Sequence, residues 1–537
     1  MMSYYKDLRE YLRTLEKHGK LVRIKSPINK DTELHPLVRL QYVGLPEEQR
    51  KAFLFENIVD SRGKAYQGSV AVSALAASSE IYAIGMMCQP EEISEKLTKA
   101  QSDPIEPKIV REGPAQEEVH LGDSLLEHGG LDEFPIPIST PGYDAAPVFT
   151  APAWISKDPE SGIRNTGTYR AMIKSPTRTG IDFSDPGKGC AIHWRKCKER
   201  GVPLQAAIVV GGPPCIGYAS VSRYPTDVDE MAVAGGIAGE PLELVKCKTL
   251  DLEVPAHAEV VIEGELNTDE LELEGAFGES GGFMSLTQPR PYFTVKCITH
   301  RRNPIWLAFI SQYQPSESSK VKQYGNESVI FNYLREHLGM EHVLDVAFYE
   351  TSDSSRFLVL KLKKVEQDEV WRTLEAAVSQ RAGPRRNKII IAVDEDINHR
   401  DSDAVIWALS HRFQPHRDCR IVTHPSPTLV DLSLAPSEEL ERLRAETNPE
   451  MPESSIMLIN ATLKWPYPPV SLPTKEFMEK ALQLWEKEGL PPLKLTEPWW
   501  GHNLGYWSDE DKEKAERAVR GEYYQTGDNV ATRRMPT

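Results

Sequence analysis

Short strand-like segments recur between turns rich in glycine and proline through the middle of the chain, from about residue 126 to residue 325. The clearest of them span residues 205–210, 258–262, 292–298 and 305–310. Strands this short, separated at regular intervals by turns, are typical of sandwiches and barrels. The pattern therefore predicts a central β-barrel-like domain.

The two flanking regions mix helical and strand-like patterns instead, so the predicted fold class is mixed α/β (α+β). A chain of 537 residues has room for two to four domains at roughly 100–200 residues each. We expect an N-terminal α/β domain over residues 1–125, the central domain over 126–325, a C-terminal α/β domain over 326–490 and a helical tail over 491–537. The charged tail is a candidate docking segment for another subunit.

Charge and composition exclude several classes of function. With 79 Asp and Glu residues against 63 Lys and Arg, the net charge is −16, which disfavours a nucleic-acid partner. The first residues contain no apolar signal core, and no window holds the roughly 18–20 apolar residues of a membrane span. Seven widely spaced cysteines without a CxxC pair are typical of a reducing compartment. The expected location is therefore cytoplasmic, with no membrane partner.

One motif suggests a serine hydrolase and is rejected. Residues 278–282 (GESGG) fit the G-x-S-x-G elbow, which needs a strand before it and a helix directly after it. The next residues, FMSLTQPRPYF, contain two prolines and are poor helix formers. The chain also has no P-loop, and Gly235–Gly239 lacks the spacing of a dinucleotide loop.

Three short segments carry a mixed set of metal-ligating side chains. Asn165 and Arg170 flank Gly167, so an amide oxygen and a guanidinium can reach one site; the alternative is a turn with a surface arginine. His193 opens a helical stretch, where a packed or capping histidine is the alternative, and Glu230 precedes an apolar run, where it could only compensate a helix dipole. Amide oxygen, imidazole nitrogen and carboxylate oxygen together suit Mn²⁺, Mg²⁺ or Fe²⁺ when a cofactor phosphate and waters complete the octahedron.

A fourth segment, residues 274–279 (EGAFGE), places two carboxylates in what its glycines make a tight loop. Carboxylates near one arginine can take different pKa values, so that one stays ionised while the other donates a proton. The alternative is an acidic surface hairpin, because more acidic residues lie just upstream.

Taken in order, these segments resemble the UbiD family of prenylated-FMN-dependent decarboxylases. The resemblance covers roughly residues 5–490 and is most specific between 165 and 310. It lies in the patterns NxGxYR, VPAxAExVIEG and EGxFGE, followed by Ile298-Thr299-His300-Arg301. Ala276 stands where many relatives have proline, which leaves both carboxylates in place.

The resemblance implies a split β-barrel (flavin-reductase-like) cofactor domain and a C-terminal oligomerisation domain. It implies prenylated FMN, a divalent metal (Mn²⁺ first, Mg²⁺ or Fe²⁺ as alternatives) and K⁺ as cofactors. The divalent-metal ligands would be Asn165, His193 and Glu230. The potassium ligands would be Ala219, Ser220, Ser222 and Glu230. The cofactor contacts would be Asn165, Thr166, Gly167, Thr168, Tyr169, Arg170, Ile192, His193, Glu230 and Arg412.

The implied activity is that of a carboxy-lyase: reversible, non-oxidative decarboxylation of an aromatic or α,β-unsaturated acid. Glu279 would be the acid/base that protonates carbon after CO₂ leaves, and Glu274 would pair with Arg170 to orient the substrate. A flavin prenyltransferase would supply the cofactor, and a homo-oligomer, dimer or hexamer, is expected. Two other interpretations stay open: a cofactor-binding or assembly subunit with little turnover, and a conventional flavin oxidoreductase. The particular acid and the physiological direction are open as well.

Overall fold

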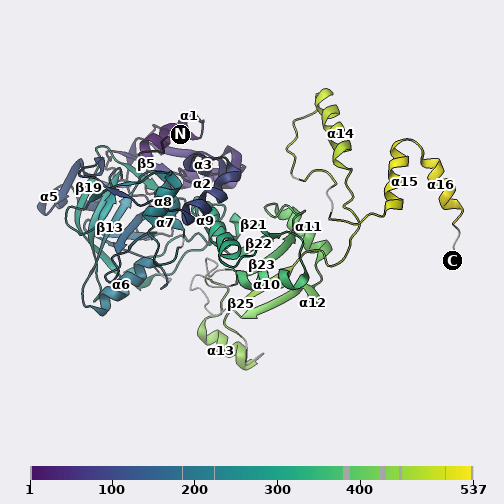
Figure 1. Ribbon diagram of the computed structural model, residues 1–537. Coiled ribbons are helices and arrows are strands. Elements are labelled where there is room, and N and C mark those ends of the chain that lie inside the picture. The colour runs from purple at the N-terminus through teal and green to yellow at the C-terminus, as the bar shows by residue number, and fades with distance from the viewer. Residues whose placement is uncertain are drawn as a thin grey trace.

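Figure 1 shows the computed structural model of the protein, which has a mixed α/β fold. It describes residues 3–183, 186–222, 224–378, 387–423, 431–446, 450, 452–496, 498–501, 504–533 and 536. Among these residues no helix has both the length and the apolar character that crossing a bilayer requires.

The N-terminal region is built on a four-stranded sheet in the order β1-β3-β5-β20. Its last strand comes from far along the chain, since β20 pairs in parallel with β5. The first helix spans Leu8–Lys17 and ends there because Gly19 takes a positive φ of 68°. The elements are α1 (Leu8–Lys17), β1 (Leu21–Ile24), β2 (Ile28–Asn29), α2 (Leu34–Gly44), β3 (Ala52–Phe55), β4 (Ile58–Val59), β5 (Ser69–Val72), α3 (Ser79–Met86), α4 (Ile93–Ser102) and β20 (Ile305–Ala308).

The central region forms one curled, nine-stranded antiparallel sheet in the order β10-β9-β13-β16-β19-β12-β11-β8, with β7 also paired to β19. Because β10 and β8 stay at opposite ends of this order, the sheet is a half-barrel. The predicted β-rich central region is confirmed at this level, while the flavin-reductase-like split barrel stays a prediction. The strands are β7 (Glu118–Leu121), β8 (Val148–Phe149), β9 (Ala153–Lys157), β10 (Arg164–Thr168), β11 (Ala171–Ser175), β12 (Arg178–Gly180), β13 (Leu204–Val210), β16 (Val260–Leu266) and β19 (Tyr292–His300).

Helices and small ladders cover the half-barrel and carry most of the polar segments singled out above. The ladder β17-β18 holds the loop between residues 274 and 288 at the edge of the sheet. No helix follows Ser280 among residues 275–287, as the rejection of the hydrolase motif requires. The elements are β6 (Lys108–Ile109), α5 (Asp123–Glu127), α6 (Gly189–Glu199), α7 (Pro214–Val221), α8 (Glu230–Ala238), β14 (Glu243–Lys246), β15 (Glu253–Pro255), β17 (Glu272–Glu274) and β18 (Gln288–Arg290).

The C-terminal region contains a five-stranded sheet in the order β21-β22-β23-β25-β24, parallel at its centre and antiparallel at both edges. Beyond it, the last three helices form an arm that extends away from the body (Figure 1). The elements are α9 (Glu317–Asn332), β21 (Val343–Phe348), β22 (Phe357–Leu362), α10 (Gln367–Ala377), β23 (Ile389–Asp394), α11 (Ser402–Arg412), α12 (Pro415–Asp418), β24 (Cys419–Thr423), α13 (Ser437–Glu446), β25 (Ser455–Asn460), α14 (Lys475–Lys487), α15 (Asp509–Val519) and α16 (Tyr523–Ala531).

One hydrophobic core runs through the N-terminal and central regions, from Tyr4 to Tyr324, while two smaller clusters lie in the C-terminal region. The boundary expected near residue 125 is therefore not a break in the core. Helix α9 contributes residues both to this core and to a C-terminal cluster, and the predicted domain bounds stay predictions.

Candidate cofactor pocket and active site

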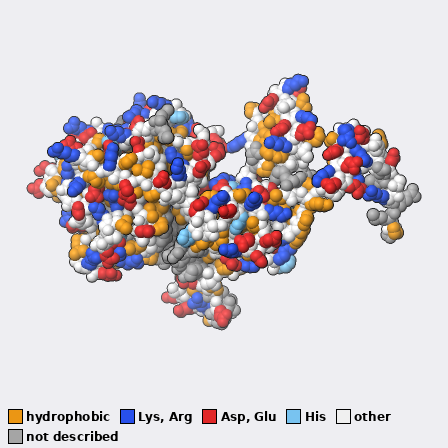
Figure 2. Space-filling view, viewed as in Figure 1, with side chains coloured by type: hydrophobic (Ala, Val, Ile, Leu, Met, Phe, Trp, Pro, Cys, Tyr) orange, Lys and Arg blue, Asp and Glu red, His pale blue; other side chains and the backbone are white. Residues whose placement is uncertain are grey.

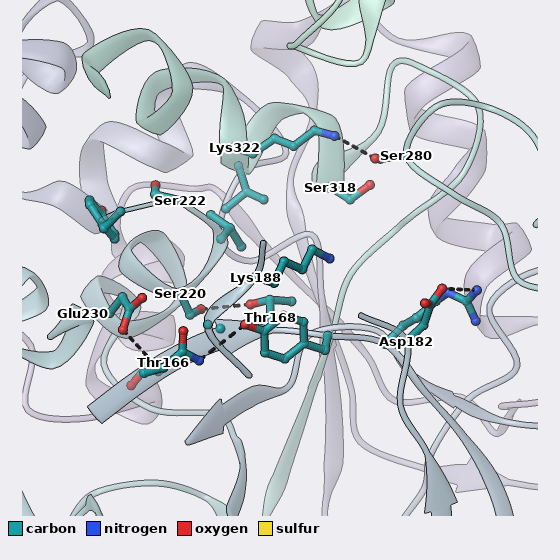
Figure 3. Close-up of a pocket in the computed structure, with 18 of the residues that line it drawn as sticks. Thr166, Thr168, Asp182, Lys188, Ser220, Ser222, Glu230, Ser280, Ser318 and Lys322 are labelled. Atoms are coloured by element: carbon teal, nitrogen blue, oxygen red, sulfur yellow. Dashed lines mark hydrogen bonds and ion pairs between the residues drawn. The ribbon is translucent and has the colours of Figure 1, made fainter. Parts of the chain in front are cut away.

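A polar pocket lies where β10, the start of α6, residues 220–230 and the loop around Glu279 meet α9. In Figure 3, Glu230 and Asp182 stand on opposite sides of it, and Lys322 of α9 donates to Ser280 Oγ at 2.7 Å above them. The pocket thus has two chemically different ends, one beside Glu230 and one beside Asp182.

The first end holds the three residues predicted as divalent-metal ligands. Asn165 lies on β10, His193 on α6 and Glu230 at the start of α8, and all three line the pocket. The carboxylate of Glu230 accepts a hydrogen bond from the backbone N–H of Thr166 at 2.7 Å, which fixes it against β10. Burial raises the pKa of the Glu230 carboxyl to about 8, so a bound cation would relieve the cost of its charge.

The histidine at this end is buried, oriented by a hydrogen bond and uncharged at neutral pH. His193 is 4% exposed and contacts Ser156 Oγ through Nδ1 at 2.9 Å. Burial lowers the pKa of His193 to about 4, so the ring is neutral near pH 7 and keeps a lone pair for a metal. Gly189 leaves room for the amide: a Cβ there would lie 1.8 Å from Asn165 Oδ1. These donors fit an octahedral divalent ion completed by phosphate oxygens.

The wall between the two ends is lined by small polar groups. Thr168 Oγ1 and Ser220 Oγ share a hydrogen bond at 2.9 Å, and Lys188 lies over the Tyr169 ring at 5.2 Å. Of the predicted potassium ligands, Ser220 and Ser222 line the pocket, whereas Ala219 is buried in the core and can offer only its carbonyl. That carbonyl already accepts from the N–H of Ser222 at 3.2 Å.

The second end holds an arginine between two carboxylates. Arg170 Nε donates to Glu279 Oε1 at 3.0 Å, and its Nη2 donates to Asp182 Oδ2 at 2.7 Å and to Ser285 Oγ at 2.9 Å. The guanidinium also lies over the ring of Phe277 at 5.1 Å. Four contacts therefore fix its plane.

Asp182 is a site residue that the sequence analysis missed. Burial would raise the pKa of its carboxyl, but Arg170, Lys188 and Arg290 outweigh burial and lower it. The group is therefore ionised at neutral pH and holds Arg170 from the side opposite Glu279. The sequence feature that could have identified Asp182 is a single carboxylate flanked by two apolar residues, Ile181 and Phe183.

The expected pairing of Glu274 with Arg170 is not what the structure contains. Glu274 is 1% exposed, accepts from the N–H of Met172 at 2.8 Å and lies 3.6 Å from Lys174 Nζ. Since Glu274 ends β17 and packs over Gly180, its carboxylate is bound by the neighbouring strand β11. Burial raises its pKa, and the charge of Arg170 still acts on it from a distance.

A second cavity opens on the other side of the arginine. It shares Arg170, Asp182, Glu279 and Ser280 with the first pocket and adds Glu274 to the lining. The rest of its wall is partly apolar and includes Phe283, Met284, Leu286, Arg290, Arg356 and Leu432. The three residues predicted as catalytic, Arg170, Glu274 and Glu279, therefore meet at this second cavity.

Two predicted cofactor contacts lie elsewhere. Arg412, at the end of α11, is bound by Asp394 at 2.9 Å and by Asp396 at 2.7 Å and does not line the pocket. Two carboxylates, one at the end of β23 and one just after it, neutralise the guanidinium in this structure, and its contact with the cofactor stays a prediction. Ile192 precedes His193 on α6 and is not among the residues that line the pocket. Lys188 and Lys322, which were not predicted, supply positive charge there instead.

Comparisons with known proteins identify the family. Models of the 3-octaprenyl-4-hydroxybenzoate carboxy-lyase match three successive parts of the chain. The N-terminal domain matches residues 12–101, the Rift-related domain 108–313 and the C-terminal domain 323–443. An uncharacterised protein of Aquifex aeolicus is 30% identical over 519 residues, covering 91% of this chain and 100% of that protein.

Solved structures of UbiD-class enzymes have the same fold. The chain resembles an evolved dimeric form of HmfF from Pelotomaculum thermopropionicum in complex with prFMN, with a TM-score of 0.73 and 29% identity over 87% of this chain and 97% of that one. It resembles the closed form of vanillic acid decarboxylase from Sedimentibacter hydroxybenzoicus with a TM-score of 0.76 and 25% identity over 90% and 100%. Because the three family models together span most of its length, the chain belongs to the UbiD family of carboxy-lyases.

Proposed function

We propose that the protein is a carboxy-lyase that uses prenylated FMN for reversible, non-oxidative decarboxylation of an aromatic or α,β-unsaturated acid. The observation that carries this proposal is the Arg170–Glu279 pair at 3.0 Å, in the same pocket as Asn165, His193 and Glu230. A proton donor beside a positioned cation, next to a metal and phosphate site, is what such a reaction needs from the protein.

The end of the pocket beside Glu230 is proposed to hold the cofactor phosphate. Asn165, His193 and Glu230 would bind a divalent ion, Mn²⁺ before Mg²⁺ or Fe²⁺, and that ion would bind the phosphate. Ser220 and Ser222 would contribute to a K⁺ site. Prenylated FMN, when bound, supplies the electron sink that side chains lack.

The end beside Asp182 is proposed to bind the substrate and to supply the proton. Arg170, held by Asp182, would orient the substrate carboxylate. When the bond between that carboxylate and the carbon breaks, CO₂ leaves and the electron pair stays with the carbon. Glu279 would then pass its proton from Oε to the same carbon, and carboxylation is the reverse. Glu274 would act through its burial and charge beside this pair, without direct contact to Arg170.

The second cavity supports a flat, largely apolar substrate. Phe283, Met284 and Leu286 offer an apolar wall, and Arg290 and Arg356 also line the cavity. This lining favours an aromatic acid with a polar substituent over a short aliphatic acid. The direction of the reaction depends on CO₂ concentration and stays open.

The C-terminal arm supports a homo-oligomer, dimer or hexamer. Helix α14 buries none of its residues, and Leu484 (58%), Tyr506 (65%) and Val519 (62%) are exposed. Figure 2 shows apolar side chains over this arm. Such surfaces mark protein contacts, and a second copy of the chain is the proposed partner. A flavin prenyltransferase is the proposed source of the cofactor, in the cytoplasm.

The mass of the bound cofactor tests the proposal. The protein would be co-expressed with a flavin prenyltransferase, denatured without oxygen and examined by mass spectrometry. The mass of FMN plus one prenyl unit is expected, followed by CO₂ release from a panel of aromatic acids. Plain FMN with nicotinamide-dependent reduction would favour a conventional oxidoreductase. Prenylated FMN without turnover of any acid would favour an assembly subunit.

A further inference from the structure

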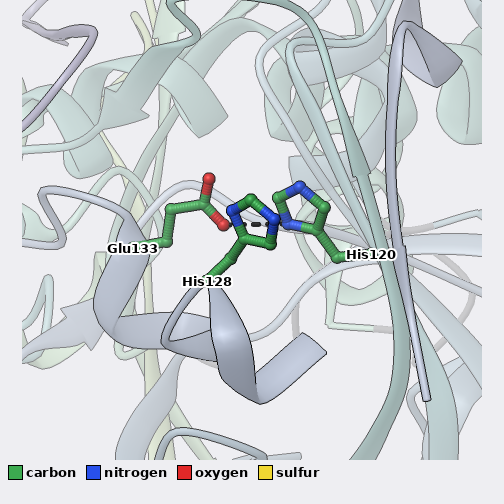
Figure 4. Close-up of side chains that lie close together, drawn as sticks. All are labelled: His120, His128 and Glu133. Atoms are coloured by element: carbon green, nitrogen blue, oxygen red, sulfur yellow. Dashed lines mark ion pairs between the residues drawn. The ribbon is translucent and has the colours of Figure 1, made fainter. Parts of the chain in front are cut away.

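A cluster of histidines surrounds one carboxylate at the edge of the half-barrel, away from the residues that line the cofactor pocket. His120 lies on β7, His128 follows α5, and Glu133 ends the short 3-10 turn Gly130–Glu133 (Figure 4). The strand pairing of β7 with β19 adds His300 from the end of β19. The topology thus gathers four ligand-type side chains from two distant parts of the chain.

The distances suit a shared ion. One ligand atom from each of His120, His128 and Glu133 lies within 4.8 Å of the other two. His120 Nδ1 lies 3.0 Å from Glu133 Oε2, and His300 Nε2 lies 3.5 Å from Glu133 Oε1. The rings of His120 and His128 are 3.9 Å apart and nearly parallel.

The buried atoms in this cluster lack hydrogen bonds, which is the independent sign of a missing ligand. His120 and His300 are each 6% exposed. His120 Nδ1, Glu133 Oε2 and His300 Nε2 are buried and make no hydrogen bond of acceptable geometry, in spite of the short separations. Buried polar atoms are almost always satisfied, so the unsatisfied atoms of His120, Glu133 and His300 indicate, beside the spacing of the ligand atoms, that something binds there.

The hydrogen bonding of His300 also fits a metal ligand. His300 Nδ1 lies 2.8 Å from the backbone carbonyl of Arg301, and a carbonyl can only accept. Nδ1 is therefore the donor, and Nε2 is turned toward Glu133, an arrangement common for metal-bound histidines.

We propose that His120, His128 and Glu133 bind one divalent transition-metal ion of the zinc class, with His300 Nε2 completing the tetrahedron. Two imidazoles and a carboxylate are a typical set for Zn²⁺, whereas Mg²⁺ and Ca²⁺ prefer oxygen ligands alone. The parallel rings must tilt for both lone pairs to converge. His128, exposed and placed after a five-residue helix, is the ring that can turn.

The ion would have a structural role. It would hold residues 122–133, which follow β7 in the chain, against the C-terminal end of β19. None of the four side chains lines the cofactor pocket, so the ion would not take part in turnover.

Zinc binding to the full-length protein tests this. Protein stripped with a chelator would be titrated with ZnCl₂ alone, against a chromophoric chelator, and bound zinc counted per chain by elemental analysis. His128→Gln and Glu133→Gln, both at partly exposed positions, should bind one zinc ion fewer than wild type, or bind it at least roughly tenfold more weakly. His416→Gln, which removes an exposed histidine on α12, is the matched control and should bind like wild type.

A further variant distinguishes zinc bound at this cluster from zinc bound in the cofactor pocket. His193→Ala removes a ligand from the pocket and should keep the zinc ion bound at His120. If His128→Gln and Glu133→Gln both bind zinc with the stoichiometry and affinity of wild type, the proposal is wrong. It is equally wrong if all zinc bound by wild type is lost in His193→Ala.

Discussion

Replacing Gly180 with alanine should remove most of the activity while the cofactor stays in place. Gly180 ends β12 beneath the carboxylate of Glu274, and a Cβ at this position would lie 1.6 Å from Glu274 Oε2 and 2.5 Å from its Cδ. Ordinary contact begins near 3.4 Å, so the carboxylate must move by about 1.8 Å. The side chain cannot retreat into solvent, because it is 1% exposed.

This displacement sets the expected size of the effect. The moved carboxylate gives up the hydrogen bond from the N–H of Met172, at a cost of about 1–3 kcal/mol. A misplacement of about 1 Å in an active site can cost roughly a hundredfold in rate. We therefore expect kcat to fall at least roughly a hundredfold, equivalent to about 2.7 kcal/mol in the barrier.

The assay compares two quantities, the flavin content per chain and the rate of CO₂ release. Gly189→Ala makes the equivalent change at the other end of the pocket, because its Cβ would lie 1.8 Å from Asn165 Oδ1. This variant should lose its metal and flavin, in contrast to Gly180→Ala. Gly44→Ala, with nothing within 4 Å, should behave like wild type. Gly180→Ala protein that keeps a turnover within a few-fold of wild type would show that the position of Glu274 does not matter.

Three further predictions concern single side chains. Glu279→Gln should keep its flavin and metal and lose turnover at least roughly a hundredfold, the usual effect of a missing general acid; a rate near that of wild type would remove Glu279 from proton transfer. His193→Ala should mainly lower cofactor occupancy, measured by flavin absorbance and metal analysis, and full occupancy would contradict the assignment of this ligand. Burial alone would raise the pKa of Glu47, but Lys320 and Ser79 lower it to about 2. Since this is below the ordinary 4.5, the stability from Glu47 is present above pH 4.5 and lost as the pH falls toward 2. The denaturant midpoint of Glu47→Gln should therefore fall less steeply with acid than that of wild type, and parallel curves would contradict this.

The sequence was informative where local chemistry and spacing determine structure. The strand pattern located β13 and β19 to within two residues, and Asn165, His193, Glu230, Arg170 and Glu279 do line one pocket. Their catalytic and ligand roles stay predictions. This agreement follows because four of these residues lie near the end of an element or in a short loop, where direction is set locally, while His193 lies within the first half of α6.

Tertiary contacts account for what was missed. Which carboxylate holds Arg170 depends on how β12 and β17 pack, so Asp182 could not be distinguished from other acidic residues. Helix α9 lacks the apolar pattern that predicts a helix from sequence, because buried polar side chains replace the usual apolar stripe. Glu317, for example, accepts from the N–H groups of Ser73 and Leu75 at 2.9 Å, and no pattern of hydrophobicity reports such contacts.

The position of β20 makes the order of synthesis matter. Strand β5 pairs with β3 on one side and with β20 on the other, but its partner residues 305–308 emerge about 236 residues after residue 69. At 5–20 residues per second, the ribosome needs on the order of ten to fifty seconds to deliver them. Throughout that interval one edge of β5 is an open template for other chains. A nascent chain of this protein therefore gains from protection of this open edge, and a chaperone that shields residues 69–72 should raise the yield of folded protein.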